Sequence, residues 1–329
     1  MARIVRFDQT GGPEVLQIRD EIVPPPAQGE IQIAVHALGL NRAEVMFRSG
    51  QYLEAPQLPA RLGYEAAGTV AAIGEGVSGF AVGDAVSTIP AFSLNEHGVY
   101  GELANVPATA VAKHPASLPW EVAAAVWMQY MTAYGALVDI AAARPGDFVL
   151  IPAASSSVGL AAIEIANLSG AIPIAVTRTN AKRESLLKAG AQHVIVTAEQ
   201  DIVAEVNRIT ADKGARIIFD PVAGPGLNQL AEAAAQDGII FLYGALSTEP
   251  TPLPLLPVLG KRLTIRGYVL FELTTDPARL ERGKRFILNG LEQGKLKPVI
   301  ARTFTLDQIV EAHRYMESNQ QIGKIVVTV

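Results

Sequence analysis

The sequence predicts an α/β protein in which a mostly antiparallel β domain is joined by an inserted, doubly wound parallel sheet. Short alternating apolar segments, separated by glycine and proline, fill roughly the first 115 residues and are typical of a barrel-like sheet. From about Trp120 the chain becomes alanine-rich, and strand-like and helix-like segments then alternate at regular spacing. Such alternation is typical of a parallel sheet with crossover helices.

Composition restricts the class of protein. The 329 residues are 49% hydrophobic and 18% charged, which indicates a chain folded throughout and too long for one small core. A net charge of −5 without a long basic run speaks against nucleic acid or an anionic membrane as a partner. Cysteine is absent, which excludes disulfides, thiolate catalysis and cysteine-ligated zinc. The five histidines never pair at metal-ligand spacing, so we expect no metal.

The sequence also predicts a cytoplasmic protein. Residues 2–7 lack the long apolar core of a signal sequence. No stretch of 18 or more residues is free of polar groups, as a membrane-spanning helix would require. Even the most apolar region, residues 122–140, contains Gln129 and Asp139.

The expected elements follow in chain order. Strands of the first domain are expected at residues 4–7, 16–18, 31–37, 68–73, 85–89, 101–106 and near Val111. Strands of the parallel sheet are expected at 148–151, 172–177, 193–196, 217–220, 239–243 and 263–269, with helices at 158–169, 181–189, 202–211 and 227–235. A proline-rich loop at 250–257 carries a short helix, and the tail holds a helix at 279–292, a strand at 299–305, a helix at 307–318 and a strand at 324–329.

These elements predict three segments. Residues 1–121 form the first part of the β domain, 122–268 form the parallel sheet with its helices, and 269–329 return to the β domain, since this tail is too short for a third domain.

The turn after the expected strand at 148–151 is a candidate phosphate-binding loop. Its small residues stand in the pattern Ala154-x-Ser156-x-x-Gly159, and apolar residues at helical spacing follow. Small side chains let backbone N–H groups approach a pyrophosphate, whose charge the start of the next helix stabilises. The alternative is an ordinary helix N-cap, because serine oxygens accept hydrogen bonds from the first helical amides.

Motifs spread over nearly the whole chain resemble the medium-chain dehydrogenase/reductase superfamily, specifically its zinc-independent quinone oxidoreductase branch, which is zeta-crystallin-like. They lie in residues 10–16, 39–41, 48–52, 62–68, 74–77, 82–86, 132–134, 144–147, 220–224 and 323–327. The resemblance implies a GroES-like catalytic domain, a Rossmann cofactor domain, and a cleft between them where a nicotinamide meets its substrate. The chain departs from the branch at Ser156-Ser157, where two glycines are usual, and at Glu164, where glutamine is common. We interpret this as a variant cofactor site, because serine still leaves room for a backbone contact.

The cofactor is expected to be NADPH. In NAD-binding versions of this fold, a carboxylate at the end of the second strand hydrogen-bonds the ribose 2′-hydroxyl. This chain instead has Thr177, Arg178, Lys182 and Arg183 in this region, and guanidinium and ammonium groups bind a 2′-phosphate. The alternative is a solvated helix start, although the helix dipole disfavours cations there.

Other cofactor contacts are implied by the resemblance alone. The phosphate turn and helix start would contribute Ser155, Ser156, Ser157, Val158 and Gly159, and the nicotinamide would lie near Thr132 and Phe271. Two strand ends would contribute Val222 and Gly244, and the closing tail would contribute Asn319 and Lys324. Each of these residues also has an ordinary packing explanation, which for Phe271 is core burial and for Gly244 a turn.

The resemblance also bears on the chemistry. Zinc alcohol dehydrogenases of this superfamily hold a catalytic metal with a cysteine, a histidine and a third ligand, whereas this chain has Asn41 and Tyr64 at the corresponding places. Without a Lewis acid, hydride transfer to an electron-poor quinone or conjugated enone remains feasible. Asn41 and Tyr52 are expected to hold the developing oxyanion, and Tyr52 is the candidate proton donor, with Tyr64 and Tyr130 in reserve. Packing of the ring is the alternative role for Tyr52.

Two other functions remain open, namely an enoyl-thioester reductase and an NADPH-binding protein with little turnover. The partner is expected to be a small-molecule electron acceptor.

The last strand of the parallel sheet, near residues 263–268, leaves an unpaired edge, which predicts a homodimer.

Overall fold

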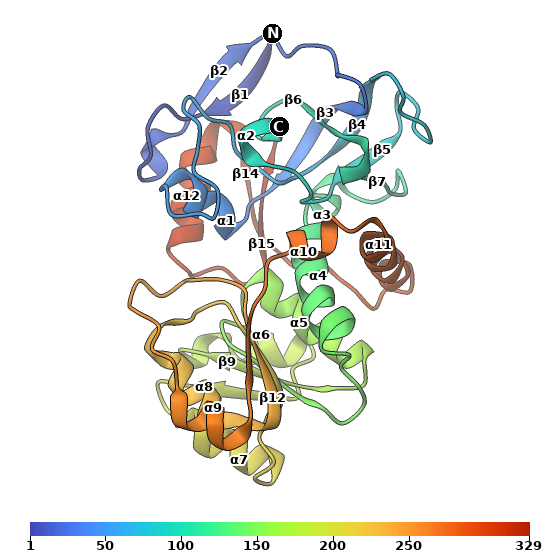
Figure 1. The fold of residues 1–329 in the computed structure, drawn as a ribbon. Coiled ribbons are helices and arrows are strands. Elements are labelled where there is room, and N and C mark those ends of the chain that lie inside the picture. The colour runs from blue at the N-terminus through green and yellow to red at the C-terminus, as the bar shows by residue number, and fades with distance from the viewer. The chain divides into compact units, whose positions relative to one another are not determined.

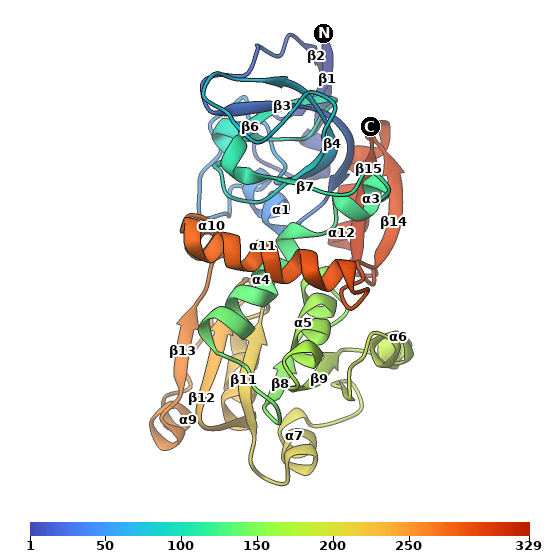
Figure 2. The ribbon, with the colours of Figure 1, turned by 90° about the vertical axis from the view of Figure 1, so that its right-hand side faces the viewer.

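The computed structural model describes all residues, 1–329, and the chain forms two compact units. The first unit comprises Met1–Met128 and Pro298–Val329, and the second comprises Gln129–Lys297. Figures 1 and 2 show the first unit as β-rich and the second as a sheet with flanking helices. The predicted α/β fold class is confirmed. The second unit extends to Lys297, whereas the sequence placed the return to the β domain at residue 269.

The first unit is built on a seven-stranded sheet in the order β14-β15-β3-β4-β5-β7, with β6 also paired to β3. Its strands are β3 (Glu30–Gly39), β4 (Glu65–Ile73), β5 (Ala85–Thr88), β6 (Leu103–Pro107), β7 (Val111–Lys113), β14 (Ile300–Thr305) and β15 (Lys324–Thr328). Only β14 and β15 pair in parallel, and β1 (Ala2–Arg6) forms a separate antiparallel pair with β2 (Gln17–Glu21). The ten residues of β3 alternate between buried and partly buried side chains over most of their length, as a strand with one face on a core requires.

Helices are short in this unit: α1 (Arg42–Arg48), α2 (Leu94–His97), α3 (Trp120–Ala123) and α12 (Ile309–Glu317). Helix α1 begins at a capping box in which the Glu44 carboxylate accepts the N–H of Asn41, the N-cap residue. The tail strand β15 pairs with β3, with Val326 opposite Gly39. The tail residues 298–329 therefore belong to the β-rich unit.

A buried histidine makes the stability of this unit depend on pH. His313 of α12 is 0% exposed, and neither ring nitrogen has a hydrogen-bond partner. Burial, followed by the charges of Arg48 and Arg42, lowers the pKa of His313 to about 3. In the unfolded chain a histidine has a pKa near 6.5, so the unfolded state binds an extra proton below that pH.

Acidification should therefore destabilise the protein through His313. Between pH 7 and pH 5 the contribution of this residue to the free energy of unfolding should fall by about 2 kcal/mol. Urea unfolding of the wild type and of His313→Leu at both pH values measures this contribution as the difference between the two pH dependences. Equal pH dependences in the two proteins would contradict the assignment.

The second unit is a six-stranded parallel sheet in the order β10-β9-β8-β11-β12-β13. Its strands are β8 (Phe148–Ile151), β9 (Ile172–Thr177), β10 (His193–Val196), β11 (Ala215–Asp220), β12 (Ala234–Leu242) and β13 (Thr264–Gly267). The strand order reverses between β8 and β11. In sheets of this kind, ligands bind outside the carboxyl ends of the strands at such a reversal.

Helices and helical turns surround this sheet: α4 (Trp127–Tyr134), the π-helical segment η3 (Gly135–Ile140), α5 (Ser157–Leu168), α6 (Arg183–Lys188), α7 (Ile202–Thr210), α8 (Leu227–Ala233), α9 (Leu255–Lys261), α10 (Phe271–Thr274) and α11 (Pro277–Glu292). Leu150 of β8 and Ile218 of β11 are 0% exposed in the core cluster that these helices cover. None of the helices has the length and apolarity needed to cross a bilayer.

Candidate functional site

The turn after β8, which the sequence predicts as a phosphate loop, leads directly into α5. Ser156 is the N-cap of α5, and its Oγ accepts the backbone N–H of Gly159 at 3.0 Å. A Cβ on Gly159 would lie 2.6 to 2.8 Å from backbone atoms of Ala154, so only glycine allows helix and turn to approach this closely. Ser157 and Val158 begin the helix and are partly buried. The N-cap contact and a phosphate-binding role are compatible, since capping occupies only one helical amide.

A basic corner lies beside this turn, formed by Ser155, Arg178 and Lys182. The Lys182 ammonium donates to Ser155 Oγ at 3.1 Å, which joins the phosphate turn to the segment after β9. Burial, and then the charge of nearby Arg178, lower the pKa of Lys182. Arg178 is exposed at the end of β9, directly after Thr177, which is 7% exposed. Two cations held this close repel each other, and an anion between them would stabilise both.

Arg183, the third predicted cation, lies differently. Its Nη1 donates to the backbone oxygen of Val194 at 3.2 Å, so this guanidinium is fastened to β10. Its contact with a cofactor stays a prediction.

The predicted residues at the ends of β11 and β12 are held by a buried carboxylate and a close turn. Asp220 is 0% exposed and accepts the N–H groups of Val222 and Ala223 at 2.8 and 3.0 Å. Burial raises the pKa of Asp220. A Cβ on Gly244 would lie 2.8 Å from the Pro221 oxygen, so glycine permits this turn. Val222 lies just after the carboxyl end of β11, and Gly244 lies just after that of its neighbour β12.

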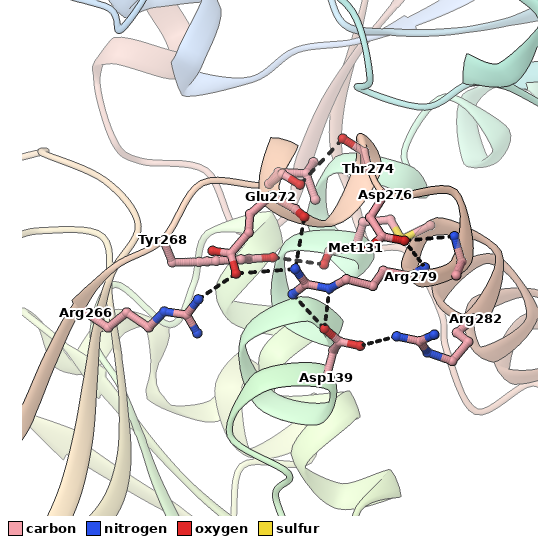
Figure 3. Close-up of polar contacts among 11 residues, drawn as sticks. Met131, Asp139, Arg266, Tyr268, Glu272, Thr274, Asp276, Arg279 and Arg282 are labelled. Atoms are coloured by element: carbon pink, nitrogen blue, oxygen red, sulfur yellow. Dashed lines mark hydrogen bonds and ion pairs between the residues drawn. The ribbon is translucent and has the colours of Figure 1, made fainter.

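Phe271 begins α10, and an ion network fixes this short helix (Figure 3). Arg279 of α11 donates to Asp139 Oδ2 at 2.7 Å and to the backbone oxygen of Glu272 at 3.0 Å. Arg266 of β13 donates to the Glu272 carboxylate at 2.5 Å. The network thus joins β13, α10, α11 and η3. Phe271 itself is partly buried.

Two predicted residues lie on α4. Thr132 is 6% exposed. Tyr130 is 1% exposed, and its hydroxyl donates to Glu164 Oε2 at 2.7 Å, which also accepts the N–H of Lys297. Burial, followed by the charge of Glu164, raises the pKa of Tyr130 far above that of a free tyrosine. The hydroxyl of Tyr130 is therefore engaged with Glu164, the residue that departs from the branch pattern.

In the first unit the structure brings Tyr52 and Tyr64 together. Their rings lie 6.4 Å apart, centroid to centroid, with an interplanar angle of 60°. Tyr52 also meets Phe47 of α1 edge to face at 6.5 Å. Burial raises the pKa of Tyr52, and a hydrogen bond with Tyr64 opposes this rise. Burial also raises the pKa of Tyr64, which is 1% exposed. Both phenols thus remain protonated at neutral pH.

Asn41 lies in a buried cluster of charged groups. Its Nδ2 donates to Glu44 Oε1 at 3.2 Å, Glu65 Oε2 at 3.1 Å and the Gly39 oxygen at 3.1 Å. Its Oδ1 accepts the ammonium of Lys324 at 2.6 Å. The amide is therefore directed at groups of its own unit, and a role in holding an oxyanion stays a prediction.

The two predicted tail residues lie in different environments. Lys324 is 1% exposed, whereas Asn319 is exposed with a positive φ of 58° and accepts a hydrogen bond from Arg42 through Oδ1. These observations do not test the predicted role of Lys324 or Asn319 in cofactor binding.

Sequence reasoning missed the acidic members of the buried cluster. Glu44 receives four hydrogen bonds, among them those from the Tyr64 N–H at 2.9 Å and the Tyr100 hydroxyl at 2.6 Å. The capping-box spacing of Asn41 and Glu44 was a usable signal for this local contact. The pairing of Glu65 with Lys324 joins residues far apart in the chain and has no local signal.

Comparisons with known proteins agree with this architecture. Residues 27–116 match a family model described as alcohol dehydrogenase GroES-like domain, and residues 157–283 match one described as zinc-binding dehydrogenase. The quinone oxidoreductase of Homo sapiens is 32% identical over 330 residues, covering 99% of this chain and 98% of the relative.

Two solved structures are similar over nearly their whole length. Escherichia coli quinone oxidoreductase complexed with NADPH has a TM-score of 0.91 at 30% identity, covering 100% of both chains. A structure described as an NAD-dependent alcohol dehydrogenase has a TM-score of 0.91 at 34% identity, covering 99% of both chains. The sequence identities, the matched domains and the fold together show that this chain belongs to the quinone oxidoreductase branch of the medium-chain dehydrogenase/reductase superfamily.

Proposed function

We propose that this protein is an NADPH-dependent reductase of quinones or of conjugated enones and alkenals, working by hydride transfer without zinc. The observation that carries the proposal is the basic corner of Ser155, Arg178 and Lys182 beside the phosphate turn. Arg178 follows the end of β9, where NAD-specific versions of this fold carry a carboxylate, and the ammonium of Lys182 lies near it. The solved Escherichia coli relative in complex with NADPH supports the same cofactor.

The residues present fit this cofactor. The turn that Gly159 allows, with the start of α5, would receive the pyrophosphate, and Arg178 and Lys182 would bind the 2′-phosphate by charge-assisted hydrogen bonds. Val222 and Gly244 would line the groove at the strand ends, and Phe271 would wall the nicotinamide. Because one similar structure is described as NAD-dependent, NADH is the competing cofactor, and the basic corner favours NADPH over it.

When bound, NADPH supplies the hydride that reduces the acceptor. The Tyr52 hydroxyl is then proposed to donate a hydrogen bond to the acceptor oxygen as negative charge develops there. Tyr64 supports this role, because the hydrogen bond between the two phenols favours the ionised form of Tyr52. Asn41 is the second proposed donor to the oxyanion.

The proposed activity is tested by a screen of NADPH oxidation across quinones, alkenals, nitroalkenes and enoyl thioesters, with NADH run in parallel. We expect turnover with quinones or enones and a preference for NADPH. A strong preference for enoyl thioesters would instead indicate an enoyl-thioester reductase. Binding of NADPH without turnover of any acceptor would indicate a binding protein.

We also propose that the protein is a homodimer assembled through β13. This strand pairs only with β12, so its other edge is free in the single chain. Preceding it in the chain, Leu253, Leu255, Leu256 and Leu259 are 63%, 54%, 79% and 64% exposed. An exposed apolar segment followed by an open strand edge favours a second copy across a two-fold axis.

Leu256→Glu should accordingly convert the dimer to a monomer, because each copy would bring a charge into the apolar contact. Light scattering at micromolar concentration measures the mass, and circular dichroism checks that the fold persists. Ile22→Glu, which alters an 83% exposed residue of the first unit, should leave the mass unchanged. A monomeric wild type, or a dimeric Leu256→Glu, would count against this interface.

A further inference from the structure

The loop that carries Tyr52 is fastened to the short helix α2 by a single carboxamide. Residues 51–59 form neither helix nor strand. Asn95 of α2 donates through Nδ2 to Glu54 Oε1 at 2.8 Å and to the backbone oxygen of Ala55 at 2.9 Å. Its Oδ1 accepts the backbone N–H of Gln57 at 2.8 Å. The side chain of Asn95 therefore binds the loop at three places shortly after Tyr52.

Helix α2 is itself anchored in the first unit. Leu94, its first residue, is 0% exposed. Ser93 is the N-cap, and its Oγ accepts the backbone N–H of Asn95 at 3.1 Å. The same hydroxyl donates to the carboxylate of Glu54. The loop is thus attached to a helix whose own position is fixed by burial and by its cap.

The segment that leads into α2 also contacts the partner of Tyr52. Phe92 is 6% exposed, and the centroid of its ring lies 5.8 Å from that of Tyr64. The ring of Tyr64 lies 6.4 Å from that of Tyr52. Residues 92–95 therefore act on Tyr52 by two routes, namely the hydrogen bonds of Asn95 to the loop backbone and the row of aromatic rings.

We propose that Asn95 is a positioning residue, which holds the Tyr52 hydroxyl where it can donate to the acceptor oxygen. A proton donor works only within hydrogen-bond reach of its acceptor, and a misplacement of about 1 Å can cost about a hundredfold in rate. A loop without regular structure moves over such distances unless other groups hold it. The inference rests on the proposed reductase function, and within it on the role of Tyr52.

Asn95→Ala should loosen the loop whether or not the protein turns over an acceptor. The backbone N–H of Gln57 loses its acceptor, so hydrogen–deuterium exchange in peptides spanning residues 51–59 should become about fivefold faster or more. Peptides from β8 in the second unit should exchange as in the wild type, which checks that the fold persists. Unchanged exchange in residues 51–59 would overturn the proposal.

Asn95→Ala should also lower kcat for an enone by about tenfold, with an unchanged dissociation constant for NADPH. Tyr52→Phe/Asn95→Ala should be no slower than Tyr52→Phe alone, because Asn95 acts through the Tyr52 hydroxyl. A full additional loss in the double variant would show a general effect on the fold and would overturn the proposal. A wild-type rate in Tyr52→Phe alone would instead show that the proposed role of Tyr52 is wrong, and the inference would fall with it.

Asn95→Asp tests the direction of the hydrogen bonds. It keeps the shape of the side chain but places a carboxylate opposite that of Glu54, so its kcat should be at least as low as that of Asn95→Ala. Adding Glu54→Gln should restore part of the rate, because an amide can again donate to a carboxylate between these two positions. Equal rates with and without Glu54→Gln would contradict the proposed contact.

The matched control is Asn105→Ala. It removes another carboxamide of the first unit that binds a loop, since Asn105 Nδ2 donates to the backbone oxygen of Pro24 at 3.0 Å. Both kcat and the exchange of residues 51–59 should equal those of the wild type. If Asn105→Ala lowers kcat as Asn95→Ala does, the effect is not specific to the Tyr52 loop and the proposal is overturned.

Discussion

Tyr52→Phe should lower kcat for enone reduction by about a hundredfold or more, the usual size of a general-acid contribution. The enolate formed by hydride addition is strongly basic, so its oxygen needs a donor as charge develops. A quinone yields a less basic hydroquinone anion, and its rate should fall less. Steady-state rates with both acceptor classes, at saturating NADPH, measure this difference.

The matched control is Tyr315→Phe, which removes the hydroxyl of another tyrosine in the same unit, one whose ring lies under Arg302. Its rates should equal those of the wild type. Burial raises the pKa of Tyr52, so its ionisation should not appear in the kcat profile near neutral pH. If Tyr52→Phe combined with Asn41→Ala leaves both rates unchanged, the proposed oxyanion site is wrong.

The parallel sheet was predictable because its signals are local. Strands such as residues 148–151 and 193–196 contain short apolar runs bounded by turn residues. The predicted strands at 148–151, 172–177 and 193–196 coincide with β8, β9 and β10. The extent of β12 was less predictable, because it begins at Ala234 and includes polar Gln236 and Asp237, which carry no strand pattern.

The candidate site was predictable only in part. Ser156 and Gly159 lie in one turn, so their spacing alone indicates a loop before a helix. The contact of Lys182 with Ser155 joins two adjacent strand–helix connections, which the fold class brings to the same sheet edge. By contrast, the burial of Lys324 depends on β15 pairing with β3 across nearly the whole chain. Lysines are seldom buried, so a lysine is expected to be exposed unless a pattern indicates otherwise. No local pattern around Lys324 does so.

Arg178→Ala should weaken NADPH binding by about 1.5–3 kcal/mol, the value of a lost charge-assisted hydrogen bond, and leave NADH binding nearly unchanged. The physical reason is that only NADPH carries the 2′-phosphate, while both cofactors share the pyrophosphate and nicotinamide contacts. Adding Lys182→Ala should increase the loss further, because the two cations act on one anion. Fluorescence titration of each variant with both cofactors gives the dissociation constants.

The comparison with NADH separates this role from a general effect on the fold. A loss of structure near β9 would weaken the binding of both cofactors equally. Equal losses of affinity would therefore contradict the assignment of Arg178 to the 2′-phosphate. Arg208→Ala removes an arginine of the same unit that is paired with Glu205, and it should alter neither affinity.

The ammonium of Lys182 also loses its proton at lower pH than an ordinary lysine, because burial and Arg178 lower its pKa. The preference for NADPH over NADH should consequently decline as pH rises through that lowered pKa, and Lys182→Ala should lack this decline.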